Sequence, residues 1–114
     1  MTSILTSIKK LLGIDEEYTH FDVDITMYIN SALMILNQLG VVSDEILITD
    51  KNDSWEDVIG DSKRIESIKI YVYLKVRLSF DPPTTSFAIE AIERQITELE
   101  WRLNNQVEGV ITDE

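Results

Sequence analysis

The chain has 114 residues and contains no cysteine. A disulfide framework, thiolate catalysis and thiolate metal ligands are therefore excluded. Glycine and proline are also scarce, with four and two residues, so each one marks a boundary between elements. The length suits one domain, and a hydrophobic fraction of 44% is enough to form its core.

Long apolar runs are absent as well. The densest apolar stretch is interrupted by Lys75, Arg77 and Asp81. Its uninterrupted apolar runs are therefore much shorter than the roughly 20 residues that a membrane span needs. The first residues, MTSILTSIKKLLGIDEE, place lysines inside the apolar pattern, unlike a signal peptide. We expect a protein without membrane association that is made in the cytoplasm.

Basic residues are few, with 10 against 21 acidic ones and a net charge of −11. Such a surface repels phosphate, which argues against nucleic-acid binding through a basic patch. An acidic chain could instead mimic DNA, bind a basic partner or surround DNA without gripping it. Solubility alone is the simpler explanation of the charge.

Few residues are candidates for catalysis or for metal binding. The single histidine, His20, lies near Glu16, Glu17, Asp22 and Asp24, but one histidine among common carboxylates is a weak metal signal. There is no glycine-rich phosphate loop and no nucleophile elbow. We therefore expect no catalytic residues, no metal site and no cofactor.

Periodic apolar residues predict an all-α fold, a small bundle of about four main helices. Thr2 or Ser3 can cap the start of the first helix and Gly13 suits its end, and Ser54 with Asp57 predicts a short extra helix in the 41–60 connector. The main helices are expected at 4–12, 22–39, about 62–80 and about 86–104.

The stretch IYVYLKVRLSFDPPTTSF is ambiguous. Apolar residues alternate from Tyr71 to Phe80, as in a half-buried strand. However, no turn signal lies between Asp61 and Phe80, and a strand of that length is rare. We therefore favour a buried helix that Pro82 and Pro83 end at a fixed corner.

The helix after the prolines carries an unusual tryptophan. Its apolar stripe runs through Ile92, Ile96 and Leu103, and at about 100° per residue Trp101 falls on the opposite side. Either Trp101 packs within its own fold or it anchors a partner, a role in which Trp and Arg are favoured. The candidate partner surface consists of Phe87, Glu90, Arg94, Glu98, Trp101 and Asn105.

The C-terminal residues, VEGVITDE, are predicted to be a flexible, non-helical tail over 107–114, following a helical domain over 1–106. Gly109 and the β-branched residues after it motivate this boundary. The tail is either a frayed terminus or a segment that becomes ordered on a neighbour. Val107, Val110 and Ile111 are the candidate docking residues.

Several phrases together resemble a known family. LTSIKKLLGI, YTHFDVDITMYINSALMILNQLGV, WEDVIGD, IKIYVYLKVRLSFDPPTTSF and AIERQITELEWRLN occur in this order. They resemble the small head–tail connector, or adaptor, proteins of long-tailed bacteriophages and related prophages. The resemblance covers most of the chain, from about Leu5 to Asn104.

The resemblance implies a helical structural protein of the virion without catalytic activity or cofactor. It implies a closed ring of roughly a dozen identical subunits at the head–tail junction. The ring would dock on the portal protein, extend the DNA channel without specific DNA binding, and receive the stopper or tail-completion protein. A C-terminal segment that contacts the portal is also implied.

A small acidic binding protein is the alternative. Such a protein would inhibit a DNA-binding enzyme by mimicking DNA, or neutralise a basic partner as an antitoxin does. Rings of the chain, or binding to a portal, would favour the connector function.

Overall fold

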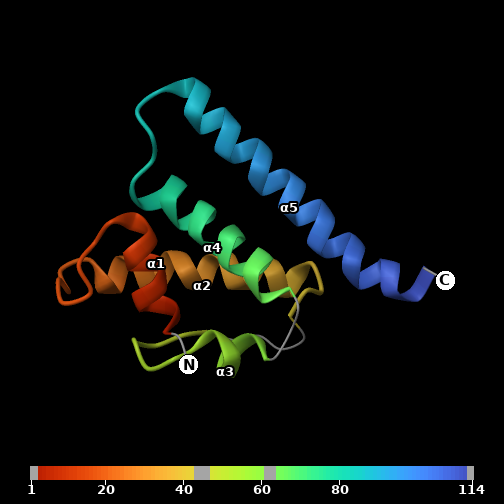
Figure 1. The fold of residues 1–114 in the computed structure, drawn as a ribbon, viewed down its shortest axis with the longest axis horizontal. Helices are drawn as coiled ribbons and strands as arrows, with labels where there is room; N and C mark the ends of the chain where they lie inside the picture. Colours follow the sequence, from red (N-terminus) through yellow and green to blue (C-terminus); the bar gives the residue numbers. More distant parts are fainter. Residues whose placement is uncertain (1–2, 43–46, 61–63, 113–114) are drawn as a thin grey trace.

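The computed structural model describes residues 3–42, 47–60 and 64–112, with side chains described as far as Asn105. These parts are helical, apart from turns, loops and one isolated bridge between Ser3 and Ser54. The predicted all-α fold is confirmed (Figure 1). The helices are α1 (Ile4–Leu12), α2 (Asp22–Gln38), α3 (Trp55–Ile59), α4 (Ile65–Phe80) and α5 (Ser86–Thr112).

Helix α4 lies at the centre of the arrangement. It packs against α2 on one side and α5 on the other, while α1 packs against α2 and α4 (Figure 1). The resulting body is flat, with extents of 48 × 35 × 19 Å. Its largest fully buried side chains come from most of the helices, and they include Ile4, Ile8, Ile29, Leu33, Trp55, Ile68, Tyr71 and Leu103.

Both ends of α1 follow from local sequence. The Ser3 hydroxyl accepts a 3.1 Å hydrogen bond from the Thr6 N–H, which satisfies one of the free donors of the first turn. Gly13 adopts a φ of 82°, the left-handed conformation that ends many helices. The predicted range of this helix is therefore confirmed, with Ser3 as the capping residue and Gly13 at the end. Thr2, the other candidate for the cap, lies outside the described residues.

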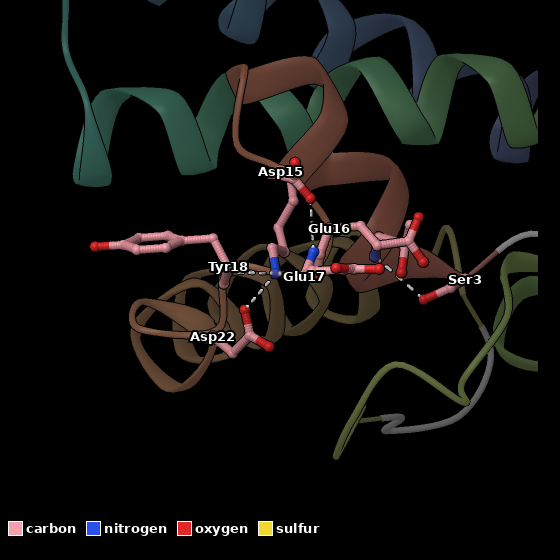
Figure 2. Close-up of polar contacts among 8 residues, drawn as sticks. Ser3, Asp15, Glu16, Glu17, Tyr18 and Asp22 are labelled. Carbon is pink, nitrogen blue, oxygen red and sulfur yellow. Dashed lines mark hydrogen bonds and ion pairs between the residues drawn. The ribbon is translucent and has the colours of Figure 1, made fainter.

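Lys9 ties α1 to the loop that leads into α2. Its side chain is 2% exposed, and its ammonium group donates to the carbonyls of Glu16 and Tyr18 at 2.9 and 2.8 Å and lies 2.8 Å from the Asp22 carboxylate. Figure 2 shows how Glu16, Tyr18 and Asp22 converge there. A buried charge with three oxygen partners holds the loop in one conformation.

The connector after α2 is fixed by side chains on α2. The Asn30 amide forms two hydrogen bonds with the backbone of Ile48, at 3.0 and 2.7 Å. Ser54 caps α3 as predicted, because its hydroxyl accepts from the Asp57 N–H at 3.1 Å. Trp55 is fully buried, and its indole N–H donates to the Ser7 hydroxyl at 2.8 Å.

Helix α4 resolves the strand–helix ambiguity. The segment Ile65–Phe80 is helical throughout, so the preference for a helix was correct, and residues 61–63 at its expected start lie outside the described residues. The buried side chains of α4 cover more than half of its circumference because α2 and α5 pack on different sides. In a helix with so wide an apolar arc, apolar residues can fall on every second position, as they do in a half-buried strand.

Helix α5 is longer than the sequence predicts. The backbone remains helical to Thr112, so the expected non-helical character of residues 107–112 was wrong. A glycine inside a helix costs only about 1 kcal/mol relative to alanine, which does not end a helix that is already formed. Residues 113–114 lie outside the described part, and the flexibility of the tail stays a prediction.

Candidate assembly surface

The six residues predicted as a partner surface all lie exposed along α5. Phe87 is 79% exposed and Trp101 is 65% exposed, unusually high fractions for large aromatic side chains. The opposite side of the helix buries Ile96 and Leu103 against the core. The α5 face is hereafter the set Phe87, Glu90, Arg94, Glu98, Trp101 and Asn105.

Two hydrogen bonds fix the rotation of α5 about its axis. The Tyr71 hydroxyl on α4 donates to the Glu100 carboxylate at 2.7 Å. The Asn104 amide donates to the carbonyl of Leu39, just after the end of α2, at 3.0 Å. Because Glu100 and Asn104 are neighbours on a half-buried side of α5, these bonds hold Trp101 on the exposed side of the helix.

The start of α5 is set by the proline corner. Asp81 leaves helical geometry, with φ −147° and ψ 68°, directly before Pro82. Thr85 then caps α5, since its hydroxyl accepts from the Ala88 N–H at 3.1 Å. The fold thus gives α5 a defined starting point as well as a defined rotation.

Trp101 borders a shallow hollow on α5. The hollow is lined by Glu93, Arg94, Thr97, Glu98 and Trp101, all from the same helix. Within the part of the chain that the structure describes, Arg94 has no ion pair, whereas Glu98 is paired with Arg102 at 2.8 Å. The hollow therefore offers an aromatic surface beside an unpaired guanidinium, the pair of groups that most often anchors a protein partner.

A second exposed apolar surface lies on α2 and was not predicted. Val23 is 81% exposed, Met27 58% and Met34 43%. The polar residues Thr26, Asn30 and Asn37 lie on another side of this helix. Two of those residues bind the connector, since Asn37 donates to the Val42 carbonyl at 3.2 Å and Asn30 binds Ile48. The spacing of Val23, Met27 and Met34 places them on one side of α2, but the sequence alone does not show that this side is exposed.

The predicted tail-docking residues Val107, Val110 and Ile111 lie on the last turns of α5. Their side chains are outside the described residues. Their role in docking remains a prediction.

The structure gives Tyr71 an unusual ionisation. Burial, and secondarily the hydrogen bond to Glu100, raise the pKa of its hydroxyl far above the ordinary value of 10.0. In the connector, the Thr49 N–H holds the pKa of Asp53 below the ordinary 3.8 by donating to its carboxylate at 2.8 Å. Both groups stabilise local structure, and neither lies in a site suited to catalysis.

His20 takes part in an aromatic cluster. Its ring packs edge-on against Phe21 with centroids 4.7 Å apart, and Phe21 packs edge-on against Phe80. Among the residues that the structure describes, no three histidine or carboxylate side chains gather as metal ligands would. Over the same residues, no helix combines the length and apolar character that crossing a membrane requires.

Comparison with known proteins identifies the family. The family model described as phage connector protein matches residues 4–110, which is nearly the whole chain. No significant match was found among curated proteins or among solved structures. The matched range includes all the helices on which the α5 face depends, and it confirms the family resemblance read from the sequence. The chain belongs to the phage connector protein family, whose members are structural components of the virion.

Proposed function

We propose that this protein is the ring-forming subunit that joins the phage head to the tail beneath the portal. The observation that carries the proposal is the α5 face, where Phe87 and Trp101 are 79% and 65% exposed in a chain of the connector family. Aromatic surface left in water by a folded subunit is typical of a protein–protein interface. A ring of roughly a dozen copies would bury it between neighbours.

The charge of the chain suits a DNA channel. With a net charge of −11 per subunit, a ring offers few cations to phosphate. DNA would therefore pass without specific binding. The same charge makes copies repel one another, so the contacts between them need apolar surface and locally opposite charges.

The portal protein above and the stopper or tail-completion protein below are the proposed partners. The end of α5 extends beyond the body of the subunit, as Figure 1 shows. We propose that this end, with Val107, Val110 and Ile111, docks on the portal. The location that follows is the head–tail junction of the virion, after synthesis in the bacterial cytoplasm.

Binding to a portal ring tests the proposal. The purified chain is mixed with the portal of the same phage, and the complex is measured by native mass spectrometry and negative-stain imaging. We expect a ring of subunits on one end of the portal. If the portal is not bound and a basic enzyme is bound tightly, the chain is an acidic binding protein instead.

A further inference from the structure

We infer that the exposed stripe on α2, formed by Val23, Met27 and Met34, receives the α5 face of the neighbouring copy. This inference rests on the proposed ring and names the surfaces that build it. A cyclic ring needs two different patches on each subunit, because its contact is not self-paired. The α5 face supplies one patch, and the α2 stripe is the candidate for the other.

The α2 stripe lies opposite the buried side of its helix. Ile25, Ile29 and Leu36 are fully buried against the core, whereas Val23 and Met27 are 81% and 58% exposed. Ser31 and Gln38 continue the same side, and the exposed Asp24 borders the stripe beside Val23. A mostly apolar, Met-containing strip on so acidic a chain is suited to a packed protein contact.

The positions of the two surfaces suit a head-to-tail contact. Helix α4 lies between α2 and α5 and packs against both (Figure 1). The α2 stripe and the α5 face each point away from the core that α4 occupies. One copy can therefore contact a neighbour through each surface at the same time.

The lengths of the two surfaces also correspond. At a rise of about 1.5 Å per residue, Val23 to Met34 spans roughly 17 Å. By the same rise, Phe87 to Trp101 spans roughly 21 Å. Two helical strips of similar length can lie against each other with both apolar ends covered.

Among the described residues, each of the two surfaces has one acidic and one basic side chain beside it that form no ion pair. A hollow beside Val23 is lined by Lys51 and Asp50 among other residues, and the hollow on α5 is lined by Glu93 and Arg94. In the described part of the chain, none of these four side chains is in an ion pair. Across the proposed contact, Lys51 faces Glu93 and Arg94 faces Asp50, which offsets locally the repulsion between acidic copies.

A complementation experiment tests the contact. Met27→Asp blocks the α2 stripe, and Trp101→Asp blocks the α5 face. We expect each variant alone to lose rings, with self-association at least tenfold weaker by sedimentation velocity. An equal mixture should form a one-to-one dimer, because the free α5 face of one variant meets the free α2 stripe of the other. The control is Leu11→Asp, an equally exposed apolar residue on α1 (54% exposed) that should leave rings intact.

The outcomes separate the two proposals. If Met27→Asp forms rings as the unmodified chain does, the α2 contact is wrong and the ring at the portal still stands. If the mixture forms no dimer although both variants are folded by circular dichroism, the contact is also wrong. If the unmodified chain binds no portal, the proposed function itself fails.

Charge reversal supplies a second readout that is independent of apolar packing. Lys51→Glu or Glu93→Lys alone should weaken association about tenfold, and the double variant should restore most of it. Equal weakening in the single and double variants would show that these two side chains do not meet.

Discussion

The Tyr71 hydroxyl on α4 donates a 2.7 Å hydrogen bond to the carboxylate of Glu100 on α5. Glu100 directly precedes Trp101, so the bond joins the buried centre of the subunit to the exposed aromatic part of the α5 face. Tyr71 is fully buried, whereas Trp101 is 65% exposed. The hydrogen bond from the buried Tyr71 therefore helps to set the orientation of the α5 face.

Removing this hydrogen bond should reduce stability. Tyr71→Phe keeps the ring and leaves the partly buried Glu100 carboxylate without its donor, which should lower the free energy of unfolding by about 1–2 kcal/mol. Urea denaturation followed by circular dichroism measures the change. Tyr18→Phe is the control, since Tyr18 is 51% exposed and should show no change. Equal stability of the two variants would mean that the bond does not hold α5.

The same tyrosine predicts a dependence on alkaline pH. Because the folded pKa of Tyr71 is raised above 10.0, its contribution to stability is complete below that pH and declines as the pH rises further. Between about pH 10 and 11.5, the unmodified chain should therefore lose stability more steeply than Tyr71→Phe. Parallel pH profiles of the two proteins would contradict the assignment.

Lys9 should be among the residues most important for stability. Lys9→Met leaves the Asp22 carboxylate and two carbonyls without their partner, which should cost about 3 kcal/mol. Lys10→Met is a matched control, because Lys10 is exposed on the same helix and its replacement should change stability by less than about 0.5 kcal/mol. Thermal unfolding of both variants measures the difference, and similar melting temperatures would show that the Lys9 ion pair contributes little.

The end of α5 should serve attachment more than folding. Deleting the residues after Gln106 should leave the melting temperature nearly unchanged while weakening binding to the portal. Surface plasmon resonance on immobilised portal rings measures that binding. Unchanged affinity would exclude a docking role for Val107, Val110 and Ile111.

Local sequence predicts the ends of these helices well where a specific side chain forms them. Ser3 and Gly13 delimit α1 as expected because capping depends on a few neighbouring atoms. Gly109 does not end α5, which continues to Thr112. A single glycine lowers helix stability without setting a boundary when a long amphipathic helix precedes it.

The exposed surfaces differ in how far the sequence reveals them. Trp101 stands out because it lies opposite a regular apolar stripe. Val23, Met27 and Met34 do not, because α2 also carries apolar residues on its buried side and a pattern cannot tell which side meets the core. Which side of α2 is buried depends on its packing against α4. The first residue of α4, Ile65, lies 42 positions after Val23 in the sequence. Only the tertiary packing shows that the α2 stripe is left in water.

We expect the α5 face to serve assembly and not folding. Trp101→Ala tests it most directly, with ring formation on the portal and the melting temperature of the subunit measured together. Gln95→Ala, an exposed change elsewhere on α5, is the control. We predict that Trp101→Ala abolishes rings while the free energy of unfolding changes by less than about 0.5 kcal/mol. Intact rings, or a large fall in the melting temperature of the subunit, would contradict the claim.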